Sequence, residues 1–576
     1  MSDRRAECRR FPARRVMLLL GAGLSFAGLP AAQGAELTAW TVDPLIKVFR
    51  DEAPGEGKEA PAEVARGECA TFQIVVRCPK PIEDLQAEIG DLARQGPGDA
   101  AALEAASVRF VGYVPVTRPT PNPASDRLRE APADYPDPLL EDDSISVPAG
   151  AAQPIWITVP IPVDAEPGIY RGELRVSGVV GGERKSTTAP LAARVYDVVV
   201  GPSRLWVTNW YFTRFHHLEV DPAPYSKEFW SLLRRFAQNM AEHRQNVAWV
   251  SPFELARGEL NDEGEIVFDF AHFDQWVEIF MEEGVIGRIE GRHIGTRSGD
   301  WSSPFVVRTL QERDGRFVPA MADPTSDEAD AFYGRFFPAL VAHLEERGWL
   351  DRYLQHLADE PIAANIDSYR AMADLARRYA PQLRIIEACH TKDLIGAIDV
   401  WVPQLNYWHR DADHYSQRQR EGEEVWFYTC MYPQGDYANR FIELPLIKTR
   451  LLHWINYRHG ATGYLHWGYN AWRDDVDPLE NPAPDHPAGR TILPAGDAWI
   501  VYPGKDGPLD SIRFEAMRDG IADYELLCML GARDPDAARR LVARHILDFD
   551  EYDCDIETFR ATRRELLTVL AEPRER

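Results

Sequence analysis

Two adjacent carboxylates, Asp359 and Glu360, are the residues of this chain best placed for acid–base chemistry. They end a short apolar run of strand type, 353–358, and Pro361 closes it. An unpaired buried charge costs several kcal/mol, so the pair is expected where the strand opens into a cleft. The structural alternative is that Asp359 caps a helix starting near Ile362, with Glu360 in its first turn. The dipeptide alone favours this capping role.

The order of the surrounding elements reverses that preference. After Gly201-Pro202, runs of strand type alternate with segments of helical period. The predicted strands are 205–210, 246–250, 285–290, 353–358, 384–388, 400–405, 425–429 and 463–467. Eight alternations predict a (β/α)8 TIM-like barrel; a doubly wound sheet is less favoured because no Gly-rich turn follows the first strand. The acidic pair then follows the fourth strand, at the face where such barrels carry active sites.

The other strand ends are expected to line the same cleft and to bind substrate. They carry aromatic, amide and charged side chains, which suit a neutral polyol held by stacking and hydrogen bonds. For each of them a structural role is an equally good explanation. The candidates are Asn209, Trp210, Arg292, His390, Asn406, Tyr407, Tyr432, Trp467, Asn470 and Trp472, with Glu290, His293, Glu387 and Tyr428 at neighbouring positions.

Metal and cofactor motifs are not recognised in the sequence. There is no zinc-like spacing, no nucleophile elbow and no phosphate loop. The acidic run Asp474, Asp475 and Asp477 lacks the full calcium-loop pattern and is more often a solvated loop. We therefore expect no metal and no cofactor.

Length and charge limit the kinds of partner. The 576 residues are 45% hydrophobic, enough for two or three domains, and the formal charge is -26. So acidic a chain is a poor ligand for nucleic acid or anionic membranes, which need clustered Lys and Arg. A glycan is the expected partner, and the oligomeric state is left open.

The first 34 residues predict an export signal. Six arginines precede an apolar run, 16–30, and a small-residue stretch, 31–34. Arg14-Arg15 resembles a twin-arginine signal, with a general secretory signal as the alternative. No later segment is long and apolar enough to span a bilayer, so a periplasmic or secreted protein is expected. Cys69 and Cys78 flank one predicted strand and are therefore not expected to pair.

The predicted domains are a signal peptide (1–34), a β-sandwich (35–201), the barrel (202–532) and a helical C-terminal extension (533–576) on the barrel's outside. The sandwich prediction rests on short alternating segments such as 70–76, where Ala70, Phe72, Ile74 and Val76 share one face. The Pro- and Asp-rich segment 115–143 is expected to be a long loop.

Several motifs together resemble glycoside hydrolase family 123. They are Ala65-Arg66-Gly67-Glu68, the Pro167-Gly168 turn, Ala358-Asp359-Glu360-Pro361, Tyr502-Pro503-Gly504 and the stretch 511–525, SIRFEAMRDGIADYE. The resemblance spans nearly the whole mature chain. It implies a β-sandwich followed by a barrel, and hydrolysis of a terminal β-linked N-acetylgalactosamine with retention of configuration. It also implies substrate assistance: Glu360 protonates the leaving oxygen and later activates water, while Asp359 holds the N–H of the acetamido group.

Two neighbouring side chains on a regular strand point to opposite sides, so both can reach one sugar only if the strand end kinks. If they converge, like-charge repulsion is expected to raise one of the two pKa values. Two alternatives stay open. One is a glycosidase of the same architecture with another sugar specificity, and the other is a non-catalytic carbohydrate-binding protein.

Overall fold

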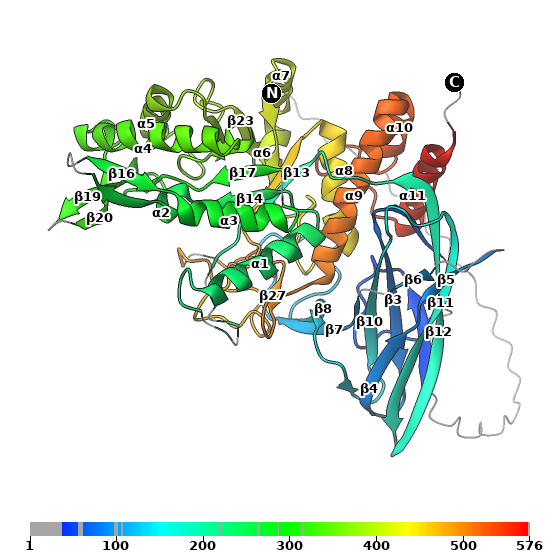
Figure 1. Ribbon diagram of the computed structural model, residues 1–576. Coiled ribbons are helices and arrows are strands. Elements are labelled where there is room, and N and C mark those ends of the chain that lie inside the picture. Colours follow the sequence, from blue (N-terminus) through cyan, green and yellow to red (C-terminus); the bar gives the residue numbers. More distant parts are fainter. Residues whose placement is uncertain are drawn as a thin grey trace, which may run out of the picture.

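The structure, a computed structural model, describes residues 37–55, 61–96, 102–104, 107–213, 215, 217–218, 220, 222–261, 265–285, 287–313, 316–489 and 491–573. The predicted export signal, 1–34, lies outside the described residues. In Figure 1, helix α9 (Ile512–Arg533) lies between the long strands of the N-terminal part and most of the larger C-terminal part.

The N-terminal part contains two sheets. The first is antiparallel throughout, with the order β1 (Thr38–Val42), β3 (Cys69–Arg77), β10 (Ala152–Pro160), β7 (Ser107–Val116) and β8 (Ala133–Leu140). The second has the order β2 (Ala62–Arg66), β12 (Glu183–Val199), β11 (Gly168–Val180), β4 (Ile82–Ile89) and β9 (Ile145–Val147). In addition, β5 (Leu92–Arg94) pairs with β11, and β6 (Ala102–Leu103) pairs with β5. Strand β8 lies within 115–143, so the prediction of one long loop there was wrong.

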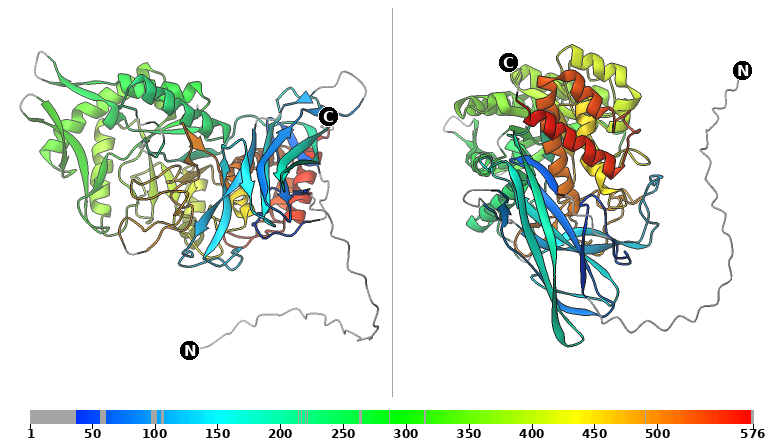
Figure 2. Two further views of the ribbon diagram at one scale, coloured as in Figure 1. Left: turned by 90° about the horizontal axis from the view of Figure 1, so that it is seen from below. Right: turned by 90° about the vertical axis from the view of Figure 1, so that its right-hand side faces the viewer.

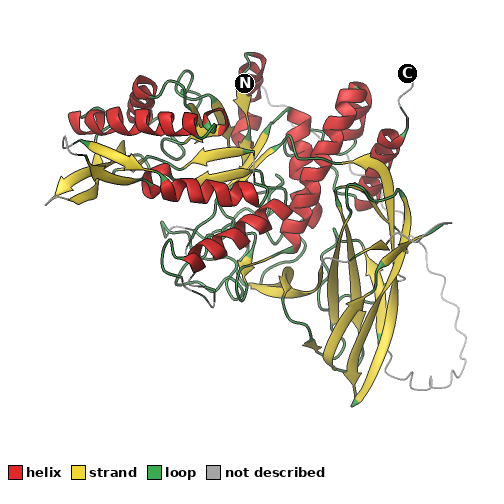
Figure 3. Cartoon of the chain, viewed as in Figure 1, coloured by secondary structure: helices red, strands yellow, loops and turns green. Residues whose placement is uncertain are grey.

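Alternating side chains build the core between these sheets. Phe72, Ile74 and Val76 of β3 pack with Leu174 of β11 and Leu191 of β12 in one hydrophobic cluster. The predicted face of 70–76 is therefore a buried face. The opposite face of β3 is covered as well, because Val75 packs with Trp40 and Val48. Figure 3 shows the long strands of this part in yellow.

The C-terminal part is built on parallel strands that occur where the sequence predicts them. They are β13 (Trp206–Asn209), β14 (Val247–Val250), β17 (Arg288–Gly291), β21 (Tyr353–Gln355), β22 (Arg384–Cys389), β23 (Val400–Pro403), β24 (Glu424–Val425) with β25 (Phe427–Tyr428), and β26 (Gly463–His466). They form two sheets, β25–β26–β13 and β14–β17–β21–β22–β23–β24.

Hydrogen bonds join these two sheets at both ends. Val207 of β13 accepts from the main chain of Asn246, which precedes β14. On the other side, Trp426 donates to Trp401 at 2.8 Å, and Gln404 pairs with Tyr428 in a parallel bridge. The strands therefore follow one another around a closed ring, and their carboxyl ends meet at one rim.

Helices follow the strands and cover the ring (Figure 1). They are α1 (Lys227–Glu242), α2 (Pro252–Leu255), α3 (Ala271–Glu282), α4 (Asp327–Glu346), α5 (Ile366–Tyr379), α6 (Leu405–Arg410), α7 (Ala412–Arg420), α8 (Leu446–His459) and α9 (Ile512–Arg533), with a 3-10 turn η1 (Leu350–Arg352). Serine caps begin three of the longer ones: Ser226, Ser326 and Ser511 each accept a hydrogen bond from the first turn.

Antiparallel insertions between the ring strands were missed by the sequence analysis. A hairpin of β15 (Arg257–Leu260) and β16 (Ile266–Asp269) precedes α3. A three-stranded sheet of β18 (Gly295–Arg297), β19 (Phe305–Arg313) and β20 (Arg316–Ala322) separates β17 from α4. After the last ring strand, a further antiparallel pair, β27 (Tyr502–Pro503) and β28 (Pro508–Leu509), precedes α9. The β18–β19 connection, 298–304, reaches the catalytic candidates.

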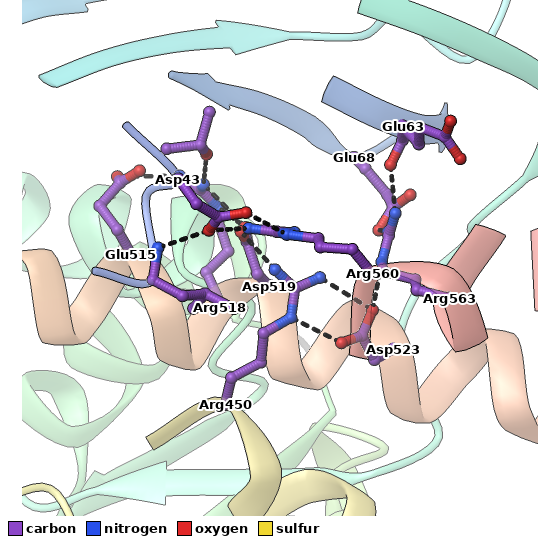
Figure 4. A network of polar contacts seen from close by, with 12 residues as sticks. Asp43, Glu63, Glu68, Arg450, Glu515, Arg518, Asp519, Asp523, Arg560 and Arg563 are labelled. Atoms are coloured by element: carbon purple, nitrogen blue, oxygen red, sulfur yellow. Dashed lines mark hydrogen bonds and ion pairs between the residues drawn. The ribbon is translucent and has the colours of Figure 1, made fainter. Parts of the chain in front are cut away.

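Helix α9 and the C-terminal helices attach the two parts to each other. Asp523 of α9 is fully buried and accepts hydrogen bonds from Arg450 of α8 and from Arg563 of α11 (Ile556–Ala571), and Arg563 also binds Glu68 of the N-terminal part. We call Glu68, Arg450, Asp523 and Arg563 the interdomain network (Figure 4).

The C-terminal extension contains α10 (Pro535–Val542) and α11. Helix α11 packs on α9 and also on β12 and β2, so it lies against both parts rather than only against the ring (Figure 2). The six cysteines of the described residues are all free thiols, in agreement with the prediction for Cys69 and Cys78. No helix within the described residues has the length and hydropathy of a membrane span.

Candidate active site

The acidic pair lies in a turn that follows β21. Strand pairing of β21 ends at Gln355, and the main chain continues through 356–361 as a turn. The next helix, α5, begins at Ile366 with Asn365 as its N-cap. Asp359 is therefore not a helix cap, and Glu360 is not in a first turn of α5. The capping alternative is wrong.

Glu360 has a left-handed backbone conformation. Its φ angle is 49°, a value that non-glycine residues seldom adopt. The left-handed residue interrupts the alternation of side chains along an extended chain, which is the kink that two consecutive carboxylates need to serve one ligand. The Asp359 side chain is 48% exposed and that of Glu360 is 17% exposed, so neither is sealed in the core.

Neighbouring strand ends hold the Glu360 carboxylate. Tyr428, at the end of β25, donates a hydrogen bond to Oε1, and Nε2 of His390, after β22, lies 3.1 Å from the same oxygen. His390 and Tyr428 are 2.6 Å apart through Nε2 and the phenol oxygen. The main-chain carbonyl of Glu360 accepts a 2.8 Å hydrogen bond from Nη2 of Arg297. Side chain and main chain of Glu360 are thus both fixed.

The two carboxyl groups have opposite pKa shifts. Partial burial of Asp359 and the negative charge of Glu360 raise the pKa of Asp359. Partial burial also favours the neutral form of Glu360, but the hydrogen bonds from His390 and Tyr428 and the charge of His390 outweigh it, so the pKa of Glu360 is lowered. One raised pKa was expected, and it belongs to Asp359 rather than to Glu360.

A buried carboxylate, Glu387 of β22, binds the main chain of the turn. Oε2 accepts hydrogen bonds from the main-chain N–H groups of Leu357 (2.9 Å) and Ala358 (3.0 Å), and from the phenol of Tyr369 (3.0 Å). Oε1 accepts from Nδ1 of His356 at 2.8 Å and lies 3.2 Å from Nε2 of His293. Glu387 was expected to line the cleft, but it is fully buried and orients the backbone before Asp359.

His356 lies between two carboxylates. Its Nδ1 is bound to Glu387, and its Nε2 is 2.7 Å from Oε1 of Glu290, which also accepts from Thr208 and Trp210. Burial alone would lower the pKa of His356, but the charge of Glu387 and the hydrogen bonds to both carboxylates raise it to about 10. In the same way, burial alone would raise the pKa of Glu387, but His356 and His293 lower it to about 2.

Three of these residues, His293, His356 and Glu387, offer ligand atoms within 4.8 Å of one another. A metal ion would need an unprotonated ring nitrogen on each histidine. Both ring nitrogens of His356 face carboxylates, so the residue is a cation with two donors. The cluster is therefore better explained as a charge network under the turn than as a metal site.

Several predicted substrate-binding residues lie around this network. His390 contacts Glu360 directly, and the ring of Tyr407 packs edge-on against His390 at 4.8 Å. Trp210 is buried beside His356, stacks on Trp249 at 4.7 Å and donates to Glu290. Arg292 lies over the ring of Trp249 at 4.0 Å, and its buried Nε has no hydrogen-bond partner among the described residues.

The prediction was wrong for three other residues, which are buried in the interior. Both side-chain groups of Asn209 are bound, to Gln245 at 3.0 Å and to Arg440 at 2.6 Å. Asn470 exchanges two hydrogen bonds with the main chain of Phe212, and Trp472 donates to the carbonyl of Val501. These side chains connect loops at the rim, so they are not available to a ligand.

The remaining candidates stay predictions. Tyr432 is 47% exposed and precedes a cis peptide bond to Pro433. Asn406 and Trp467 are half-buried. The amide oxygen of Asn406 is buried without a hydrogen-bond partner among the described residues.

Four residues near the pair were missed from the sequence: His356, Tyr369, Arg297 and Trp301. His356 is the one ionisable side chain within the apolar run 354–358. This isolated polar residue could have indicated a buried ion pair, which the structure shows with Glu290 and Glu387. Arg297 and Trp301 lie in the inserted sheet, which the sequence analysis did not identify. No sequence signal places that insertion over the fourth strand end.

A cavity of about 480 Å³ lies away from the catalytic pair, between the N-terminal sheets and α11. Its charged lining includes Asp43 with Arg560, and Glu63 with Arg564, as ion pairs. These charges already have partners, so the cavity is not the candidate site.

Comparisons with known proteins agree with the resemblance noted in the sequence. The model of the glycoside hydrolase 123 catalytic domain matches residues 206–530, and that of the glycoside hydrolase 123 N-terminal domain matches 50–178. No curated protein matches the sequence.

Among solved structures, a family 123 glycoside hydrolase from Clostridium perfringens, described in a study of glycolipid glycan hydrolysis, matches with a TM-score of 0.70. Its sequence identity is 18%, and the match covers 93% of this chain and 98% of that one. At this identity the likeness shows a shared fold. A β-glucuronidase from Parabacteroides merdae (TM-score 0.31, 10% identity, 86% and 52% covered) and an endo-β-1,4-mannanase from Thermotoga petrophila (0.34, 10%, 56% and 77%) are too distant to inform the argument.

Proposed function

The chain belongs to glycoside hydrolase family 123, and we propose that it removes a terminal β-linked N-acetylgalactosamine from a glycan, with retention of configuration, by substrate-assisted catalysis. The observation that carries this proposal is the turn at Asp359 and Glu360. Two consecutive, partly exposed carboxylates lie there, with the main chain kinked at Glu360. Such a pair suits a substrate that supplies its own nucleophile, because no second, distant carboxylate is then required.

In the proposed first step, Glu360 gives its proton to the glycosidic oxygen as the bond to the anomeric carbon breaks. The acetamido carbonyl oxygen of the same sugar forms the new bond to that carbon, and Asp359 accepts a hydrogen bond from the acetamido N–H. In the second step Glu360 takes a proton from water, which attacks the anomeric carbon and releases the acetamido oxygen. Two inversions at one carbon give net retention.

The pKa values impose a condition on this mechanism. The productive form has a protonated Glu360 and an ionised Asp359. Without a ligand, the raised pKa of Asp359 and the lowered pKa of Glu360 favour the opposite arrangement. The productive form is then a minority of the singly protonated protein. A leaving oxygen that approaches Oε1 of Glu360 competes with the donors Tyr428 and His390, and weaker donation from them raises the pKa of Glu360.

We also propose the finer architecture and location that the sequence predicts. The closed ring of parallel strands with its covering helices supports a (β/α)8 barrel, and the two sheets with a common core support a β-sandwich. Export to the periplasm or medium rests on residues 1–34. Fractionation of cells and N-terminal sequencing of the mature protein test the export.

The test of function uses an aryl β-N-acetylgalactosaminide. Glu360→Gln and Asp359→Asn are each expected to lower kcat/KM by at least about 100-fold, since the first removes the acid and the second the acceptor for the acetamido N–H. Glu166→Gln, a surface carboxylate of the N-terminal part, is the matched control and should be unaffected. NMR of the first-formed product should show the β-anomer, and an N-acetylgalactosamine thiazoline should inhibit.

Contrary results separate the alternatives. Efficient cleavage of the aryl β-galactoside, which lacks the acetamido group, would exclude substrate assistance. Preference for the N-acetylglucosaminide would assign the chain another sugar specificity. Glycan binding without turnover, unchanged in Glu360→Gln, would make it a binding protein.

A further inference from the structure

Trp301 is an exposed aromatic side chain beside the catalytic turn. It lies in the connection 298–304 between β18 and β19 and is 49% exposed. A single exposed aromatic residue on a protein surface is ordinary and needs no explanation by itself. What distinguishes Trp301 is how firmly it is held and what it lies next to.

The Trp301 ring is fixed by the residue that also fixes Glu360. The guanidinium of Arg297 lies 3.9 Å from the centre of the indole, and its Nε donates to the carbonyl of Trp301 at 3.0 Å. The Nη2 atom of the same guanidinium donates to the carbonyl of Glu360 at 2.8 Å. One planar side chain therefore sets the position of the indole relative to the catalytic turn.

The rest of the connection is ordered by its own hydrogen bonds. Oδ1 of Asp300 accepts from the main-chain N–H and hydroxyl of Ser302 and from the hydroxyl of Ser303, at 2.9 to 3.0 Å. Ser298 donates twice to the carbonyl of Pro304, closing the base of the loop. A ring held in this way loses little conformational entropy when a ligand covers it.

The neighbour of Trp301 on the catalytic side is His390. Their ring centres are 5.9 Å apart, and Nε2 of His390 lies 3.1 Å from Oε1 of Glu360. In the proposed mechanism that oxygen faces the glycosidic oxygen of the departing group. His390 is thus the common neighbour of Trp301 and of the carboxyl oxygen that faces the departing group.

Resting on the proposed function, we propose that Trp301 is the stacking platform for the sugar that leaves, the residue joined through its own oxygen to the terminal N-acetylgalactosamine. The apolar C–H face of a pyranose lies against the exposed part of the indole, as aromatic residues bind sugar rings. Trp301 thereby favours substrates whose leaving group is a sugar and contributes nothing to holding the terminal acetamido sugar itself.

The test measures binding and turnover separately. In an inactive Glu360→Gln background, Trp301→Ala is expected to weaken binding of an N-acetylgalactosaminyl-β-hexose disaccharide by about tenfold, measured by calorimetry. Affinity for the N-acetylgalactosamine thiazoline, which has no leaving group, should stay the same. In the active protein, Trp301→Ala should lower kcat/KM for the disaccharide by a similar factor. Trp301→Phe, which keeps a smaller aromatic ring, should lower it by about half as much on a logarithmic scale.

Leu547→Ala, at a 56% exposed apolar residue after α10, is the control for removing surface area and should change neither affinity. Equal disaccharide affinity with and without the indole would overturn the proposal. So would an equal loss of thiazoline affinity, because the variant would then act on the terminal sugar. Full activity of Glu360→Gln would instead contradict the proposed function, so the two failures are distinguishable.

Discussion

The phenol of Tyr428, at the end of β25, donates a hydrogen bond to the carboxylate of Glu360, which follows β21. Two strand ends far apart in the sequence thus cooperate on one acid. This bond, with the contact from His390, lowers the pKa of Glu360. The strength of the acid therefore depends on a residue that takes no direct part in the proposed chemistry.

Tyr428→Phe is expected to raise the pKa of Glu360, because a donor to its ionised form is lost. A bell-shaped profile of kcat/KM against pH reports the two macroscopic pKa values of the Asp359 and Glu360 pair. The midpoint between its two limbs should move to higher pH. Tyr170→Phe removes a phenol hydrogen bond in the N-terminal part and is the control. An unmoved midpoint would show that Tyr428 does not tune the acid.

The backbone at Glu360 predicts a conflict between stability and activity. Its φ of 49° is disfavoured for a residue with a Cβ and is acceptable to glycine. Glu360→Gly and Glu360→Ala should both be inactive, but the glycine variant should have the larger free energy of unfolding, by about 1 kcal/mol. Urea denaturation of both variants measures the difference. If alanine were as stable as glycine, Glu360 would not be strained.

His356 and Glu387 predict a stability that changes with pH. A histidine whose pKa rises to about 10 on folding stabilises the protein fully below its unfolded pKa and loses that contribution as pH rises toward 10. The pKa of Glu387 is lowered to about 2 on folding. Glu387 therefore stabilises the protein fully above its unfolded pKa and loses that contribution as pH falls toward 2. The pair is therefore most stabilising near pH 5 to 6, a window of roughly one unit.

The measurement is the free energy of unfolding between pH 6 and 10. The free energy of unfolding of the wild type should fall by about 2 kcal/mol or more between pH 6 and 10 because of His356 alone. His356→Gln should be less stable at pH 6 and show a flatter curve. Parallel curves for the two proteins would mean that His356 is neutral in the folded state.

The interdomain network predicts a large cost for one lost charge. Asp523 is fully buried between Arg450 and Arg563, so Asp523→Asn removes the carboxylate that these two buried guanidinium groups share and leaves only Asp519 for Arg450 and Glu68 for Arg563. The free energy of unfolding should fall by about 3 kcal/mol or more. Asp536→Asn, which breaks an exposed pair with Arg539, should cost less than about 1 kcal/mol. Similar thermal midpoints for the two variants would contradict the assigned role.

Much of the framework was predictable from local sequence. Strand and helix patterns depend on neighbouring residues. The buried face of β3 could therefore be located from the alternation of its side chains, and the ring strands from short apolar runs between segments of helical period. Asp359 and Glu360 could be identified because charge at the end of an apolar strand is a local signal. Their enzyme family could be identified from motifs spread along the chain.

Long-range packing determined what the sequence analysis missed. Asn209, Asn470 and Trp472 have the residue types of a sugar site, but interior hydrogen bonds to residues distant in sequence occupy them. Arg297 and Trp301 became relevant only because an inserted sheet folds over the turn.

The sequence by itself determined where the two carboxylates stand in the chain and that they follow an apolar strand. Only the tertiary structure decided how they act, since the left-handed φ of Glu360 belongs to the folded turn, burial and Glu360 raise the pKa of Asp359, and His390 and Tyr428 lower the pKa of Glu360 against the effect of burial. Hydrogen bonds and electrostatic interactions depend on distance in space, and distance along the chain does not predict it.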